Sequence, residues 1–340
     1  MKALFFILIF VVIATAFWQF FKIIGLTKKD QVATEKENNI NGWLMLGLGV
    51  FLYGLMLTSM FRGSIVLLPK LSASAEGEHI DKLFIITMTL IFVVQFITQF
   101  LIYFFTFKYR GIKGRKATFY ADSHKLELWW TITPTIVLSV LIIYGMWTWN
   151  EVQDLSDAEN PLIIEVYAKQ FQWEARYAGE DNQLGIGNVR FIKGINTMGV
   201  DMTDVNSADD IPVRELHLPK GRKVIFKFRA QDVLHSAYMP HFRAQINCVP
   251  GMTTTFGFTP TVTTIEMREN EDTKEKFEAI NKLRESEGKE LVEFDYLLLC
   301  NKICGSSHYN MQMKVIVEEE ADFNNWLKSQ KTLAQVINNK

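Results

Sequence analysis

Long apolar runs fill the first 150 residues of the chain, whereas the remainder alternates apolar and polar positions over short distances. Four of these runs approach the ~20 residues that a membrane-spanning helix requires. They cover about residues 3–26, 42–61, 83–107 and 128–149. This pattern predicts a membrane anchor of four spans, followed by a domain outside the membrane.

The charged linkers between the runs predict how the spans are oriented. Residues 108–116, KYRGIKGRK, are densely basic, and the linker 27–40 contains Lys28, Lys29 and Lys36. Because linkers rich in lysine and arginine stay on the cytoplasmic side, we expect both linkers there. Residues 150–340 then lie in the periplasm, and the anchor lies in a bacterial inner membrane.

The first apolar run also has features of a signal peptide. Lys2 precedes it, and Ala14-Thr15-Ala16 is similar to a cleavage site. The run nevertheless continues to about residue 24, and loss of one span would change the topology. We therefore expect the segment to be retained, while cleavage of residues 1–24 stays an open alternative.

Beyond Asn150 the sequence consists of short runs that favour β-strands, broken by glycine and proline. Strands this close together without long helices between them predict a β-sandwich or barrel. Two insertions interrupt the pattern: residues 179–211 predict a long loop, and residues 266–293, rich in Glu and Lys, predict a helix. Residues 321–337 are amphipathic and predict one C-terminal helix.

Composition and cysteine usage narrow the classes of function. The 340 residues are 49% hydrophobic with a formal net charge of −1, so nothing indicates a nucleic-acid partner. Three cysteines, Cys248, Cys300 and Cys304, are too few for a disulfide scaffold. No C-x-x-C-H motif occurs, so the sequence predicts no covalently attached haem.

The stretch CNKICGSSHYNM, residues 300–311, concentrates side chains that bind metals. A further histidine, His235, follows the predicted strand 223–230. The cysteines could form a disulfide, or join the histidines in a zinc site. Met311 favours copper, because a weak thioether ligand is typical of copper electron-transfer sites. A single blue copper uses one cysteine, so two thiolates bridging two copper ions would account for the second.

Several motifs in order resemble subunit II of the haem–copper cytochrome c oxidases. They are C-x-x-x-C-G-x-x-H-x-x-M from Cys300, D-V-L-H-S at 232–236, L-E-x-x-W-T-x-x-P at 126–134, Q-F-x-W at 170–173, V-P-G at 249–251 and F-x-x-W-L at 323–327. The resemblance covers about residues 80–335. It implies an α-helical transmembrane anchor whose residues 80–150 form a helical hairpin, plus an all-β cupredoxin-like barrel over 151–340. Residues 1–79 would then be an added pair of spans.

The resemblance implies a binuclear copper centre, CuA. Its ligands would be the backbone carbonyl of Lys302 and the side chains of His235, Cys300, Cys304, His308 and Met311. The centre would accept electrons from a c-type cytochrome, either a separate chain or part of a respiratory supercomplex. Haem in subunit I would receive these electrons. Subunit I would also hold CuB, and O2 would be reduced to water there, coupled to proton pumping. No catalytic residue is expected in this chain, and its partners would be the other oxidase subunits and membrane lipid.

Three further residues gain candidate roles from the resemblance. Phe171 stands where the family usually has tryptophan, and with Trp173 it would form the electron entry; both could instead be ordinary strand residues. Glu127 opens the last span and would mark the entry to a proton pathway. The alternative for Glu127 is a simple interfacial acid, which is common at helix ends.

The chain also departs from the family around the cysteines. Lys302 replaces a glutamate that usually reaches a magnesium ion, while Asn247 and Met252 replace an aspartate and an arginine nearby. An ammonium cannot ligate magnesium, so these changes put that magnesium site in doubt. Two other classes stay open: a copper-free subunit of the quinol-oxidase type, and a zinc-stabilised binding module on a membrane anchor.

Overall fold

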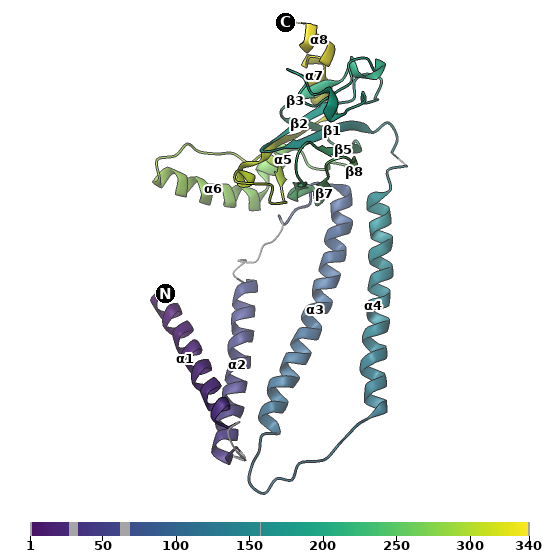
Figure 1. Ribbon diagram of the computed structural model, residues 1–340. Coiled ribbons are helices and arrows are strands. Elements are labelled where there is room, and N and C mark those ends of the chain that lie inside the picture. The colour runs from purple at the N-terminus through teal and green to yellow at the C-terminus, as the bar shows by residue number, and fades with distance from the viewer. Residues whose placement is uncertain (1, 27–32, 62–68, 157, 339–340) are drawn as a thin grey trace. The chain divides into compact units, whose positions relative to one another are not determined.

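Four long helices occupy the first half of the chain. The computed structural model describes residues 2–26, 33–61, 69–156 and 158–338. The helices are α1 (Lys2–Leu26), α2 (Glu35–Phe61), α3 (Ala75–Lys108) and α4 (His124–Gln153) (Figure 1). In the described chain, α2, α3 and α4 are long and apolar enough to cross a membrane, whereas α1 contributes a shorter apolar stretch over residues 9–22. The span at 3–26 therefore stays a prediction.

Capping residues explain why the helices are longer than the apolar runs. Thr34 precedes α2, and its hydroxyl accepts a hydrogen bond from the N–H of Glu37 at 3.3 Å, while the Glu37 carboxylate accepts from the N–H of Thr34 at 2.9 Å. Ser74 precedes α3 and accepts from the N–H of Gly77 at 3.1 Å. Such caps satisfy the free N–H groups of a first turn, so each helix starts at its polar cap and not at its first apolar residue.

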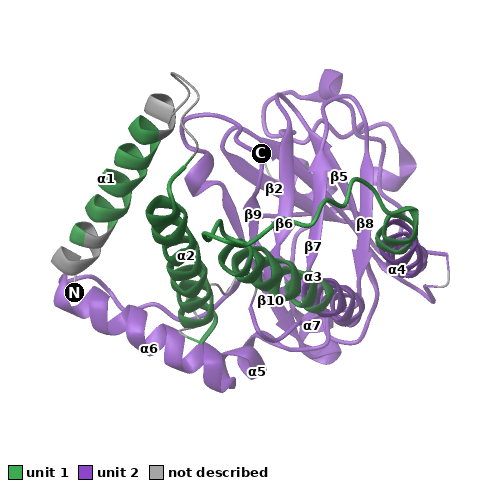
Figure 2. Cartoon of the chain, turned by 90° about the horizontal axis from the view of Figure 1, so that it is seen from below, with its two compact units in different colours: residues 1–65, 89–130 green, residues 66–88, 131–340 purple. Residues whose placement is uncertain are grey.

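The chain divides into two compact units, coloured in Figure 2. Unit 1 comprises residues 1–65 and 89–130, and unit 2 comprises residues 66–88 and 131–340. The start of α3 and most of α4 therefore belong to the same unit as the β-domain. Inside this unit, Arg243 of the β-domain pairs with Asp81 of α3 at 2.7 Å.

The β-domain consists of two five-stranded sheets. The first has the order β3-β2-β1-β5-β8, with strands Ile211–Val213, Gln172–Tyr177, Leu162–Lys169, Val224–Ala230 and Thr254–Phe258. The second has the order β4-β10-β9-β6-β7, with strands Leu216–Pro219, Gln312–Glu318, Tyr296–Cys300, His235–Met239 and Ala244–Cys248. Two parallel pairs, β1 with β5 and β4 with β10, make both sheets mixed. The predicted fold class, a helical anchor plus a cupredoxin-like β-barrel, is confirmed.

Alternation along the strands builds the core between the sheets. In β5 every second residue is buried, and Phe226 stacks on Phe258 with ring centroids 5.3 Å apart. Phe242 also stacks on Phe258, with ring centroids 4.7 Å apart. Offset aromatic stacking of this kind adds to the stabilisation from buried area. A rigid aromatic core thus supports both sheets.

Helices lie in the insertions and at the C-terminus. The predicted helix in 266–293 is observed as α5 (Thr264–Glu269) and α6 (Glu271–Ser286). The insertion 179–211 carries two short 3-10 helices, Val189–Phe191 and Val205–Ser207, and is otherwise a loop up to β3. The prediction of one C-terminal helix is wrong: α7 (Glu320–Ser329) and α8 (Leu333–Asn338) are separate. Thr332 caps α8, because its hydroxyl accepts from the N–H of Gln335 at 3.4 Å.

A buried cluster of charges joins the insertion 179–211 to the first sheet. Arg176 of β2, 1% exposed, donates to Glu165 of β1 at 2.5 Å, to Asp210 and to the carbonyl of Gly185. Burial opposes ionisation of Glu165, but Arg176 and Arg229 together lower the pKa of its carboxyl. Burial raises the pKa of Asp210 to about 7, against the opposing effect of Arg176. Arg176 therefore holds the strand and both ends of the inserted loop together.

Replacing Arg176 with alanine should strongly destabilise unit 2, because two buried carboxylates would lose their shared cation. Breaking a buried ion pair costs about 3–5 kcal/mol, which corresponds to a fall in Tm of roughly 6–20 °C for a domain of this size. Thermal unfolding of the purified full chain, followed by tryptophan fluorescence, measures this.

The matched control is Lys274→Ala, which removes an exposed ion pair with Glu269. Exposed pairs contribute about 0–1 kcal/mol, so this variant should unfold close to the wild-type temperature. Equal Tm values for both variants would show that the cluster does not stabilise the fold.

Candidate metal centre

The sequence 300–311 forms a closed loop between β9 and β10. Cys300 is the last residue of β9, and its N–H donates to the carbonyl of Met311 at 3.1 Å. The two strands pair antiparallel from Leu299 opposite Gln312. A short 3-10 helix, His308–Asn310, lies inside the loop. The two strands thus bring both ends of the motif together and leave its cysteines and histidine on one short turn.

The two cysteine sulfurs lie at the centre of this loop. Their Sγ atoms are 3.9 Å apart, and both cysteines are free thiols. A disulfide requires about 2.05 Å between the sulfurs, so the structure contains no such bond here. The ligand atoms of His235, Cys300 and Cys304 all lie within 4.8 Å of one another. This separation is suited to a metal ion bound between them.

Each sulfur has its own imidazole and its own weak donor. The Sγ atom of Cys300 lies 3.7 Å from Nδ1 of His235 and 3.2 Å from the carbonyl oxygen of Lys302. The Sγ atom of Cys304 lies 3.7 Å from Nδ1 of His308 and 3.9 Å from Sδ of Met311. The structure therefore brings all six predicted donors together, in two half-sites of similar composition.

His235 reaches the loop from a neighbouring strand. It is the first residue of β6, which pairs with β9, and the N–H of Asn301 donates to the carbonyl of Ser236 at 2.9 Å. The imidazole is fully buried, and its Nε2 lies 2.8 Å from the carboxylate of Asp232. An Nε2–H donated to this carboxylate leaves the Nδ1 lone pair facing Cys300.

Sequence reasoning missed the two residues that hold this arrangement in place. Asp232 accepts from Nε2 of His235 and, through its other oxygen, from the N–H of Gln170 at 2.7 Å. The Gln170 side chain also donates to the carbonyl of Cys304. Burial opposes ionisation of Asp232, but these hydrogen bonds lower its pKa. Gln170 and Asp232 each stand in a quoted motif, Q-F-x-W and D-V-L-H-S. Neither motif indicates that the two residues contact each other across 62 positions.

The buried thiol of Cys304 is protonated at neutral pH before a metal binds. Burial, with a smaller effect of Cys300, raises the pKa of Cys304 to about 11. A metal ion binds thiolate, so it must displace this proton. The third cysteine, Cys248, is fully buried in β7 and lies outside this loop.

The two aromatic residues proposed for electron entry both lie against the metal loop. A Cβ added to Gly305, whose φ is +144°, would be 2.8 Å from the ring of Phe171. Trp173 is buried, and its Nε1 lies 3.4 Å from the carbonyl of Met311. Its ring centroid is 6.2 Å from that of His235. Both positions are compatible with electron entry, which stays a prediction.

The residues expected around a magnesium ion do not fit that ion. The Lys302 side chain is exposed at the loop, and Asn247 lies on β7. Met252, 54% exposed, follows in the next turn. Magnesium is bound through carboxylate and other oxygen ligands, and these three side chains offer one amide oxygen. No chemistry is therefore assigned to magnesium at these positions.

Glu127 lies in the first turn of α4, within unit 1. Its carboxylate is 3.4 Å from Nδ1 of His124, and the two side chains are 49% and 92% exposed. Both the interfacial role and the proton-pathway role match this exposure, so the role of Glu127 stays a prediction.

Fold and site together define a class of protein: a membrane-anchored, cupredoxin-like metalloprotein whose histidine and cysteine donors suit copper. Comparison with known proteins agrees. Residues 65–147 match the family described as cytochrome C oxidase subunit II, transmembrane domain. An alternative cytochrome c oxidase subunit 2 of Bradyrhizobium diazoefficiens is 33% identical over 231 residues, 67% of this chain and 72% of the relative. Cytochrome c oxidase subunit 2 of Thermostichus vulcanus is 23% identical over 292 residues, which cover 79% of this chain and 80% of the relative.

The chain belongs to the cytochrome c oxidase subunit 2 family, and it is part of an oxidoreductase complex. Solved structures similar to it include the periplasmic domain of subunit II of cytochrome oxidase of Bradyrhizobium japonicum, at 18% identity and a TM-score of 0.32, covering 52% of this chain and 96% of that one. A subunit of a heme-copper terminal oxidase dimer gives 14% identity and a TM-score of 0.31, covering 58% and 100%.

Replacing Asp232 with asparagine should weaken retention of bound copper by roughly 10- to 100-fold, the usual effect of losing a carboxylate that orients a ligating histidine. Competition of the full chain with a copper(I) chelator, followed by metal analysis, measures the change. Glu278→Gln, on the exposed side of α6, is the control and should retain copper like the wild type. Unchanged retention in Asp232→Asn would show that the carboxylate does not support His235.

Proposed function

We propose that this chain is the electron-entry subunit of a proton-pumping cytochrome c oxidase and holds a binuclear CuA centre. The pairing of donors into two half-sites carries the proposal, because each thiol has one imidazole at 3.7 Å and one weak donor. His235 and the Lys302 carbonyl would serve one copper ion, and His308 and Met311 the other. Cys300 and Cys304 would bridge both.

A single zinc ion explains the donors less well. Zinc favours four donors arranged tetrahedrally around one point. His308 falls outside the group of mutually close ligand atoms and instead approaches Cys304. Two additional weak donors, a thioether and a carbonyl, also have no use in a closed zinc site. Copper uses such weak ligands, which favours two copper ions over one zinc.

The chain's own residues would hold the copper ligands rigidly and provide the path for electrons to the centre. Two bridged copper ions would share one electron and so accept and release it with little change in geometry. The closed loop, Asp232 and the buried strand β6 keep the ligands fixed during this exchange. Phe171 and Trp173 would form the entry for an electron from a c-type cytochrome, and their contacts with Gly305 and His235 support this role.

The electron acceptor must come from a partner subunit. None of the six histidines lies in the apolar centre of a predicted span, so the haems and CuB that reduce O2 to water would be bound by subunit I. The chain would assemble with subunit I and other oxidase subunits, and receive electrons from a separate cytochrome chain or one within a supercomplex.

The same proposal includes the organisation of the chain in a bacterial inner membrane. Residues 1–79 would form the additional pair of spans, residues 80–150 the hairpin that packs in the oxidase, and residues 151–340 the periplasmic barrel. The basic linkers at 27–40 and 108–116 support this orientation.

Metal analysis of the purified oxidase tests the centre. We expect two copper ions in this chain with a near-infrared absorption that depends on them, and we expect Cys304→Ser to lose the absorption and at least one copper. Cys248→Ala, which changes a buried cysteine outside the loop, should keep both copper ions. One zinc per chain would instead indicate a zinc-stabilised module, and no metal would indicate a quinol-oxidase type of subunit.

Glu127→Gln tests the proton pathway. If the carboxylate receives protons, its loss should slow proton uptake and turnover several-fold while the copper absorption stays unchanged. Stopped-flow proton uptake by reconstituted oxidase measures this. Glu35→Gln, at the start of α2, is the control, and wild-type uptake in both variants would leave Glu127 as an interfacial acid.

A further inference from the structure

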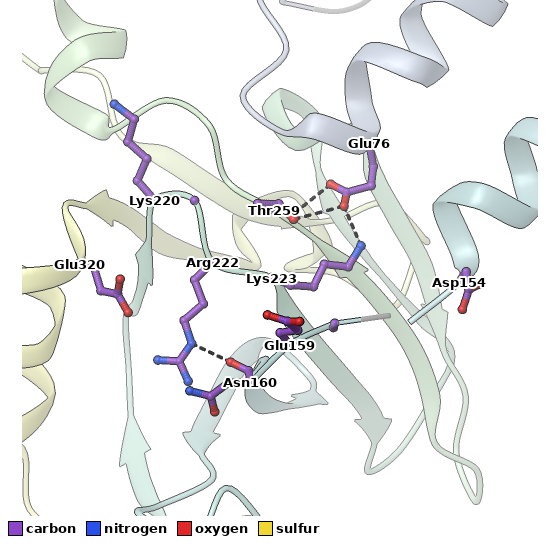
Figure 3. Close-up of a pocket in the computed structure, with 11 residues that line it drawn as sticks. Glu76, Asp154, Glu159, Asn160, Lys220, Arg222, Lys223, Thr259 and Glu320 are labelled. Atoms are coloured by element: carbon purple, nitrogen blue, oxygen red, sulfur yellow. Dashed lines mark hydrogen bonds and ion pairs between the residues drawn. The ribbon is translucent and has the colours of Figure 1, made fainter. Parts of the chain in front are cut away.

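A hollow of about 680 Å³ lies beside the ends of α3 and α4, within unit 2. Glu76, in the first turn of α3, and Asp154, directly after α4, both line it. Its floor comes from the turn 220–223 between β4 and β5 (Figure 3). Because α3 and α4 are the candidate spans, this hollow lies where the chain leaves the membrane.

Aromatic residues support this placement at the membrane surface. Trp147 and Trp149, in the last two turns of α4, are 59% and 62% exposed. Exposed tryptophan is enriched where the hydrocarbon meets the lipid headgroups. A hollow that begins five residues beyond Trp149 therefore lies at the level of the headgroups.

Two of the three basic side chains in the turn already have carboxylate partners. Lys223 pairs with Glu76 at 2.6 Å, and Lys220 pairs with Glu266 at 2.6 Å. Arg222 differs, because its Nε donates to the carbonyl of Asn160 at 3.0 Å and no carboxylate pairs with it in the described part of the chain. The rest of its guanidinium fork is free to bind a phosphate in a bidentate way.

Acidic side chains also line the hollow. Glu159 and Glu320 are two of them, and neither has an ion-pair partner among the residues the structure describes. Asp154 accepts hydrogen bonds from Ser156 and keeps a pKa below its usual value through them. One free cation among three acids disfavours a purely anionic ligand and favours one that carries both a phosphate and an ammonium.

Apolar residues follow Glu76 along one face of α3. Glu76, Ile80 and Leu83 are spaced by four and three residues, so they share one face of the helix. Ile80 and Leu83 line a second hollow of about 440 Å³ with Trp149 and Val152 of α4. A polar site at the helix end followed by an apolar surface along the span matches the shape of a phospholipid.

We propose that the hollow binds the headgroup of a phosphoethanolamine phospholipid from the periplasmic leaflet. Arg222 takes the phosphate, and Glu159 with Glu320 takes the ammonium. A choline headgroup has no N–H to donate to the carboxylates, so it binds less well. The proposal is independent of the metal centre, because none of these residues contacts the loop 300–311 through any interaction found in the described chain.

Native mass spectrometry of the purified full chain tests the site. The protein is mixed with equal amounts of phosphatidylethanolamine, phosphatidylcholine and phosphatidylglycerol in nanodiscs, extracted, and the retained lipid is counted. We expect phosphatidylethanolamine to be retained roughly tenfold more than the others, since hydrogen bonds to charged groups contribute about 1.5 kcal/mol or more each. Equal retention, or a preference for phosphatidylglycerol, overturns the proposal.

Two variants separate the contributions of the two charges. Arg222→Gln should lose most of the retained lipid of every class, whereas Glu159→Gln should chiefly lose the preference for ethanolamine over choline. Lys328→Gln, exposed in the last turn of α7, is the control and should behave as wild type. Retention that is unchanged in Arg222→Gln overturns the site.

Discussion

The hydrogen bond between the N–H of Cys300 and the carbonyl of Met311, at 3.1 Å, is the contact on which the candidate metal centre depends. It closes the loop from which all donors but His235 project. The remaining donor, His235, lies on strand β6, which pairs with β9 on the side opposite β10. The order β10-β9-β6 in one sheet therefore brings the six donor atoms together through backbone pairing. A site held in this way by backbone pairing needs little reorganisation when its charge changes, which is the property that a relay of electrons requires.

Electrostatic contacts extend this rigidity toward the membrane. Arg243 binds Asp81 of α3 through two nitrogens, at 2.7 and 2.8 Å, and also donates to the carbonyl of Pro69. Lys223 and the N–H of Thr259 bind Glu76 one turn earlier. Both acids lie in the first two turns of α3, so the helix cannot tilt against the barrel without breaking buried contacts. The start of α3 is thus attached to the β-domain by ion pairs as well as by the chain connection.

Much of the site could be predicted from the sequence, because its donors are close together in the chain and their chemistry is specific. Alternation along β5 and β10 likewise indicated the barrel, since a half-buried strand has a period of two. The supporting contacts could not be predicted. Gln170 and Cys304 are 134 residues apart, and Arg176 reaches Asp210 across an inserted loop. Residues 321–337 have the same amphipathic pattern before and after the break between α7 and α8, so the sequence did not indicate that Thr332 caps a second helix. Local patterns give donors and strands, whereas long-range contacts depend on the folded sheet.

At Gly305 an aromatic ring packs directly against the backbone of the metal loop. The glycine's φ of +144° and the aromatic ring that occupies the place of a side chain leave no space for a Cβ. The Phe171 ring therefore packs directly against the backbone of the loop at Gly305. If electrons enter through Phe171, as proposed, a larger residue at 305 would push this ring away from the loop and lengthen the electron path to Cys304. Glycine at position 305 would then keep that path short.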